Sequence, residues 1–181
     1  LPNWETVGRA AFTAVKQSMA EALRTAYFDP ELKVCVFADA SEEFWCLVLT
    51  QCKPGDEKLP WDQQEGKHQL LFLKSGRFRH AQYHWPIVDK ESYPFGEVLA
   101  SLSHWINGGH HPAAFFTDHK NLLAIFCPDA REDNCSKPNQ QRRERWALNM
   151  RALWYQIFHI DGEENRLADL GTRWGNRFLS R

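Results

Sequence analysis

Apolar and polar positions along this 181-residue chain follow helical spacing in some segments and strand-like runs in others. Residues 4–26 repeat apolar positions at helical spacing and predict an amphipathic helix, which Asp29-Pro30 ends. Three apolar runs then predict strands at 32–38, 44–51 and 68–73. The segment 53–67 is rich in Pro, Gly and charged residues, and predicts a long hairpin loop. A Ser75-Gly76 turn is expected to follow the third strand.

The second half of the chain alternates between helices and strands. The longest predicted helix covers 86–106 and ends at Gly108-Gly109. The elements expected after it are a strand at 113–117, a helix at 119–126, an exposed loop at 127–140, a helix at 141–153, a strand at 155–160 and a helix at 165–172. Hairpin-linked strands followed by alternating helices and strands predict an α/β fold, with a mixed five-stranded sheet and helices on both faces.

Composition adds limits on class. Hydrophobic residues make up 43%, charged residues 25% and the net charge is -1. This balance suits one hydrophobic core and argues against a protein that coats nucleic acid by bulk charge. The apolar runs are too short for a membrane span, and no signal peptide is visible. Because the chain does not begin with Met, we expect a segment of a longer protein.

The five cysteines show no Cys-x-x-Cys spacing. Cys35 and Cys46 lie inside apolar runs. This pattern predicts buried, reduced thiols in a reducing compartment, and we expect no zinc site.

Two aspartates and one glutamate are the first candidates for chemistry. Asp39 and Asp118 each follow an apolar strand, where ligand sites of α/β sheets collect, although such residues often only form turns. Glu91 heads the apolar stripe of the long helix and is expected to face the sheet, either as a ligand or paired with an arginine. Asp89 and Glu97 fall off that stripe, and Pro94 is expected within the first helical turn.

Asp169 is the fourth candidate. It lies one turn into the last helix, for which Asn165 is the expected N-cap. If the four acids converge at one sheet edge, they repel one another unless cations neutralise them. Oxygen ligands select hard ions such as Mg²⁺ or Mn²⁺, and two such ions can support phosphodiester hydrolysis.

These acids sit in motifs that resemble a known family, the ribonuclease H domain of gypsy-type LTR-retrotransposon reverse transcriptases. The resemblance runs from about residue 4 to residue 175. The motifs are Ala38-Asp39-Ala40-Ser41, Asp89-Lys90-Glu91, Thr117-Asp118-His119-Lys120-Asn121-Leu122, Arg145-Trp146, and Gly162-Glu163-Glu164-Asn165 leading to Ala168-Asp169-Leu170. Two departures are Ala38 where Thr is usual and Leu170-Gly171-Thr172-Arg173 where Ala-Leu-Ser-Arg is common.

The resemblance implies a ribonuclease H fold and a division into a connector at 1–30 and a ribonuclease H domain at 31–181. It implies that Asp39, Glu91, Asp118 and Asp169 are catalytic and bind two Mg²⁺ or Mn²⁺ ions. The implied substrate is an RNA–DNA hybrid, and the implied partner is the polymerase domain of the same polyprotein, with no membrane. The implied location is the cytoplasmic virus-like particle of a retroelement, or the nucleus. No polymerase Tyr-x-Asp-Asp, protease Asp-Thr-Gly or integrase His/Cys cluster occurs.

Substrate contacts are predicted for one hydroxyl and four basic side chains, which are Ser41, Lys120, Arg142, Arg143 and Arg145. The alternative for the arginines is a solvated helix face. His119 and His159 are expected to be structural. Two other functions stay open, a non-catalytic connection or scaffold domain that binds nucleic acid or protein, and an integrase or resolvase core.

Overall fold

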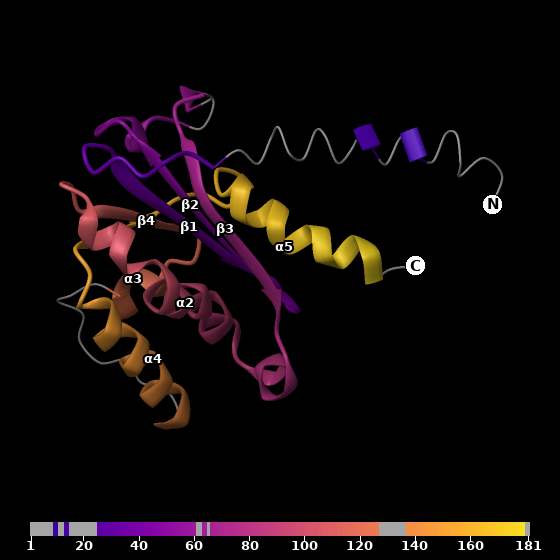
Figure 1. Cartoon of the computed structure of the whole chain (residues 1–181). Helices are drawn as coiled ribbons and strands as arrows, with labels where there is room; N and C mark the ends of the chain where they lie inside the picture. Colours follow the sequence, from indigo (N-terminus) through magenta and orange to yellow (C-terminus); the bar gives the residue numbers. More distant parts are fainter. Residues whose placement is uncertain are drawn as a thin grey trace.

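A five-stranded sheet forms the centre of the protein in its computed structural model (Figure 1). The structure describes residues 9–10, 13–14, 25–60, 63–64, 66–126 and 137–179. The strands are β1 (Lys33–Ala40), β2 (Phe44–Cys52), β3 (Gln69–Arg77), β4 (Ala113–Thr117) and β5 (Tyr155–His159), in the spatial order β3-β2-β1-β4-β5. β1, β2 and β3 pair antiparallel, whereas β4 pairs parallel with β1 and with β5. The predicted mixed α/β sheet is confirmed.

Helices cover both faces of this sheet (Figure 1). They are α2 (Ile87–Gly108), α3 (Asn121–Phe126), α4 (Lys137–Met150) and α5 (Arg166–Leu179), with short 3-10 turns η2 (Asp56–Lys58) and η4 (His80–His84). α2, α3 and α4 lie on one face, and α5 lies on the other. Within the described residues, no helix is both long and apolar enough to cross a membrane.

Strand alternation in β1 builds a separate core on each face. Val34 and Val36 join the larger cluster, together with Phe95 and Leu102 from α2. Cys35, Phe37 and Cys46 pack with Ala168 of α5 in the smaller cluster. Because successive strand residues point to opposite faces, Asp39 follows Cys35 and Phe37 toward the α5 side. This alternation places an acidic side chain at the end of an otherwise apolar strand face.

Two sequence predictions were wrong around β3 and α2. The strand β3 continues through Ser75-Gly76 rather than turning there, because Gly76 lets the Trp45 ring pack against its backbone. A Cβ at Gly76 would lie 2.8 Å from that ring. α2 begins at Ile87, so Pro94 lies inside the helix and not in its first turn.

Helix lengths also differ from the predictions in the last third of the chain. α4 begins at Lys137, within the segment predicted as loop, and α5 continues to Leu179 rather than ending at 172. Residues 137–140 are polar or proline, so apolar spacing did not reveal the start of α4, whereas residues 173–179 mix apolar with polar and basic residues. Most of the helix predicted at 4–26 lies outside the described residues.

The described end of the predicted connector is attached to the sheet. The Ala26 N–H donates to the Leu70 carbonyl at 2.7 Å, and Gln51 Nε2 donates to the Tyr27 carbonyl at 2.9 Å. These bonds anchor the chain just before β1. The boundary at residue 30 stays a prediction.

Candidate active site

Three acids from distant parts of the chain meet at one edge of the sheet. β1 and β4 run parallel, so Asp39 near the end of β1 and Asp118 just after β4 lie at the same edge. Glu91 reaches them from the second turn of α2. One carboxylate oxygen from each residue lies within 4.8 Å of the others. The predicted convergence therefore holds for these three side chains.

Hydrogen bonds fix two of these carboxylates. Thr172 Oγ1 donates to Asp39 Oδ2 at 2.6 Å, and the Ala40 N–H donates to Glu91 Oε2 at 3.2 Å. Beside Asp118, Gly162 leaves room, since a Cβ there would lie 3.2 Å from Oδ2. Asp39 and Glu91 are only 8% and 7% exposed, so water solvates them poorly. The acids are held close together in a low-dielectric environment.

The electrostatics of the cluster disfavour charge. Burial, with the nearby charges of Asp39 and Asp118, raises the pKa of Glu91 to about 9. Burial also raises the pKa of Asp39, although the Thr172 hydrogen bond lowers it, and Asp118 and Asp169 add to the increase. No basic side chain among the described residues forms a salt bridge with Asp39, Glu91 or Asp118. The alternative of a Glu91–arginine pair is thus absent from the described structure.

Asp169 lies near the cluster and outside the group of three. It sits in the first turn of α5, and Arg173 Nε donates to its Oδ1 at 2.6 Å. Its charge still raises the pKa of Asp39, so the two carboxylates interact. Asn165 precedes α5 as predicted, but its side chain does not cap the helix. Its Nδ2 donates instead to the Ala38 carbonyl at 3.0 Å, which docks the helix start on β1.

Arg142 and Arg143 bind an acid that the sequence pattern misplaced. Asp89 was predicted to lie off the buried helix stripe, yet it is 0% exposed. Arg142 Nη1 donates to its Oδ2 at 2.5 Å, and Arg143 Nε donates to its Oδ1 at 2.6 Å. The pattern failed because α4 covers this flank of α2. Both arginines therefore have a structural partner besides any role with substrate.

The remaining predicted contact residues lie on three separate segments of the chain. Lys120 is exposed two residues beyond Asp118, and Arg145 is exposed on α4. Ser41 closes the β1–β2 turn, since its hydroxyl donates to the Phe44 carbonyl at 3.2 Å and accepts from the Phe44 N–H at 3.0 Å. His159 Nε2 lies 3.2 Å from the Asp118 carbonyl oxygen, consistent with a structural histidine.

Sequence reasoning missed two residues of α5. Thr172 holds Asp39 directly, and it is 1% exposed. Gly171 lets α5 approach β2, since a Cβ there would lie 2.2 Å from Cys46 Sγ. The only available signal was helical spacing, because Thr172 lies one turn beyond Asp169.

The donor set of the cluster suits hard divalent cations. Asp39, Glu91 and Asp118 offer oxygen atoms alone, and the described residues give them no compensating positive charge. The chain was then compared with known families, and residues 29–153 match the RNase H-like domain found in reverse transcriptase. The chain belongs to this family. Its mixed sheet is the RNase H-like fold.

Similar proteins and structures agree with that assignment. Over 171 residues the chain is 25% identical to the Tf2-3 transposon polyprotein of Schizosaccharomyces pombe, covering 94% of this chain and 12% of that polyprotein. The N-terminal RNase H domain of a Mycobacterium tuberculosis protein has a TM-score of 0.53 at 13% identity, with 82% of this chain and 99% of that chain covered. A foamy viral protease-reverse transcriptase bound to double-stranded DNA has a TM-score of 0.54 at 11% identity, with 86% and 24% covered. At these identities the structures show the shared fold alone.

Proposed function

We propose that this domain is a ribonuclease H, an endonuclease that hydrolyses the RNA strand of RNA–DNA hybrids with two divalent metal ions. The observation that supports this most is the group of three carboxylates, which form no salt bridge within the described residues, in a domain of the RNase H-like family. One related structure is a foamy viral protease-reverse transcriptase in complex with RNA/DNA hybrid. We extend that substrate class to this chain.

The residues proposed to hold the ions are Asp39, Glu91 and Asp118, with Asp169 as the fourth acid. Bound Mg²⁺ or Mn²⁺ would supply activation of water and stabilisation of the leaving oxygen. Thr172 orients Asp39 through its hydroxyl, and the Ala40 N–H orients Glu91. For Asp169 to join the ligands, its carboxylate has to leave Arg173, which is an exposed and therefore weak partner.

Substrate would lie along the edge of the sheet that carries these acids. Lys120 and Arg145 are exposed and available for backbone phosphates. Arg142 and Arg143 keep some donors beyond those that bind Asp89, so we retain them as contact candidates. Ser41 lies at the turn beside Asp39 and is proposed to contact the strand there. We also propose that the domain acts within a retrotransposon polyprotein beside its polymerase, in virus-like particles of the cytoplasm or in the nucleus.

Cleavage by the purified domain tests this function. We expect cutting of the RNA strand of a labelled hybrid with Mg²⁺ or Mn²⁺, and no cutting of duplex DNA or a Holliday junction. Asp118→Asn should reduce the rate at least about 100-fold, because electrostatic groups at the reacting centre contribute on that scale. Glu163→Gln is the matched control, since Glu163 is an exposed acid that follows Gly162, the residue beside Asp118. Unchanged cleavage by Asp118→Asn would refute the assignment.

Metal binding distinguishes the proposed nuclease from the alternative, a non-catalytic connection or scaffold domain. Calorimetric titration with Mn²⁺ should show binding to the wild-type protein and weaker binding to Asp118→Asn. A folded wild-type protein that binds no Mn²⁺ and cuts no hybrid would favour the scaffold instead.

A further inference from the structure

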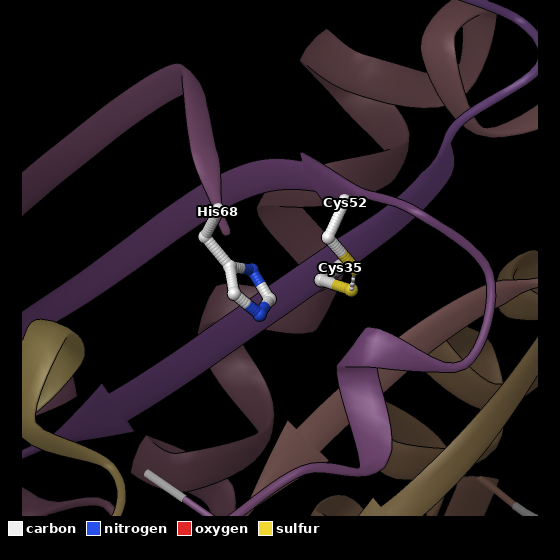
Figure 2. A group of neighbouring side chains, drawn as sticks. All are labelled: Cys35, Cys52 and His68. Carbon is white, nitrogen blue, oxygen red and sulfur yellow. Dashed lines mark hydrogen bonds between the residues drawn. The ribbon is translucent and has the colours of Figure 1, made fainter. Parts of the chain in front are cut away.

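A second group of possible metal ligands lies on the same sheet face as Asp39, toward the other end of β1. Cys35 in β1, Cys52 at the end of β2 and His68 just before β3 each offer one ligand atom, all within 4.8 Å of one another (Figure 2). Cys35 precedes Asp39 by four residues, which is about 13 Å along a strand. The group is therefore separate from the acidic cluster.

The spacing of the two sulfurs fits a tetrahedral ion. Cys35 Sγ and Cys52 Sγ lie 3.7 Å apart. Two Zn–S bonds of about 2.3 Å at the tetrahedral angle separate their sulfurs by about 3.8 Å. A disulfide requires about 2.05 Å, so the thiols would have to move closer to bond. The observed spacing is that of a hydrogen bond between the two thiols, and it also matches two thiolates on one zinc ion.

His68 is oriented as a ligand would be. Its Nδ1 lies 2.8 Å from the Thr50 hydroxyl, and its Nε2 is buried without a hydrogen-bond partner in the described part of the chain. A ring that donates from Nδ1 keeps a lone pair on Nε2, which is the arrangement of a metal-binding histidine with an outer hydrogen bond. In Figure 2 the nitrogen-bearing edge of the ring faces the two cysteines. Phe37 packs on the ring edge-to-face, with centroids 5.7 Å apart.

Charges around the group balance before a metal binds. Lys33 Nζ and Glu57 Oε1 form a buried ion pair at 2.8 Å, and Gly55 N–H donates to the other oxygen of Glu57 at 2.6 Å. Asp56, the other acid close enough to influence His68, forms a salt bridge with Lys67 at 3.4 Å. Two thiolates with one divalent ion and a neutral imidazole add no net charge, so this buried environment can accept the complex.

We infer that Cys35, Cys52 and His68 bind one Zn²⁺ ion, with water in the fourth position. Binding releases the two thiol protons to solvent, and each sulfur lone pair forms a bond to the ion. Phe37 and Glu57, which lie beside the group, also line an open hollow of about 300 Å³, although none of the three ligands lines it. The ion would join β1, β2 and the start of β3, and it would stabilise the folded state. Such a site would contradict the expectation of no zinc site that the cysteine spacing gave. The antiparallel register places Cys35 opposite Thr50 and so brings the three ligands together.

Cobalt and zinc titrations of the purified domain test the site. We use Asp118→Asn protein in excess Mg²⁺, so that the acidic cluster does not contribute. Co²⁺ should give sulfur-to-metal charge-transfer absorption of two thiolates and strong tetrahedral bands, and Zn²⁺ should replace it at one ion per chain. His68→Gln and Cys52→Ala should weaken Zn²⁺ binding at least about 100-fold, since even outer-shell changes cost up to that factor.

Cys46→Ala is the matched control, because it removes another buried β2 thiol on the same face and should bind Zn²⁺ as before. Cys127 and Cys135 are kept in every variant. Absence of thiolate absorption in the starting protein, equal binding by the Cys52→Ala variant, or a Cys35–Cys52 disulfide found by mass spectrometry would each overturn the inference. If the variants fail to fold, the absorption of a Cys127→Ser, Cys135→Ser form of the starting protein decides, because the thiolates that remain lie on β1 and β2.

Discussion

Glu91→Gln should change how stability depends on pH. The pKa of Glu91 rises from 4.5 to about 9 in the folded protein, chiefly because the side chain is buried. The folded chain therefore holds a proton that the unfolded chain releases between these two values. Since the folded state then binds more protons, the free energy of unfolding falls as pH rises through this window.

The size of the effect follows from the shift. From pH 4.5 to pH 7 the free energy of unfolding falls by about 1.4 kcal/mol per pH unit on account of Glu91, or by about 3 kcal/mol in total. Glutamine carries no titrating proton, and its carbonyl oxygen can still accept from the Ala40 N–H. We therefore expect the stability of Glu91→Gln, relative to wild type, to increase by about 3 kcal/mol over this interval. Asp39 adds a pH dependence of the same sign in both proteins, because its pKa is also raised.

Urea unfolding in chelator, followed by tryptophan fluorescence at several pH values, measures this difference. Glu163→Gln is the exposed control and should follow wild type throughout. Adding Mn²⁺ at pH 8 should raise the unfolding midpoint of wild type more than that of Glu91→Gln, because the ligand binds the folded state. Parallel pH profiles for wild type and Glu91→Gln in chelator would refute the reasoning.

Three further substitutions test contacts around the site. Thr172→Val should lower the free energy of unfolding, measured in urea, by about 1–2 kcal/mol, because Asp39 loses a hydrogen-bond donor. The same loss should shift the acidic limb of the pH–rate profile to higher pH, and an unmoved limb would contradict this. Gly171→Ala should lower the free energy of unfolding by about 1–2 kcal/mol, although alanine has the better helix propensity. Adding Cys46→Ala to this variant should restore the stability, because it removes the sulfur that the new methyl group meets; a double variant that is no more stable would argue against the contact. Asp89→Ala should cost about 3 kcal/mol by leaving two arginines unpaired, and a loss below about 0.5 kcal/mol would show that the pair is not structural.

Apolar patterns predicted the sheet because strands buried on both faces read as continuous apolar runs. β1 and β4 were found this way, and each run pointed to an acid at its end. Glu91 was found because it heads the buried stripe of α2. Convergence of these three acids needed only the parallel pairing of β1 with β4 and one crossing helix.

Contacts between separate elements could not be read in the same way. Asp89 lies off the α2 stripe, and its burial depends on α4 packing beside it. Pairing of Cys35 with Cys52 depends on strand register, which places residues 17 positions apart side by side. The apolar pattern of the sequence indicates which face of an element a residue occupies, but not which other element packs against that face.

The start of α5 shows how packing and chemistry share one motif. The Asn165 side chain donates to the Ala38 carbonyl and so docks the helix on β1. The small residues Ala168 and Gly171 let the helix lie close to the sheet. Among the described side chains of this helix, Asp169 and Thr172 act on the acidic cluster. The family motif at residues 162–170 therefore serves the position of α5 on the sheet as much as the chemistry of the acidic cluster. The position matters for function because a helix displaced from β1 would carry both the fourth acid and the donor to Asp39 away together.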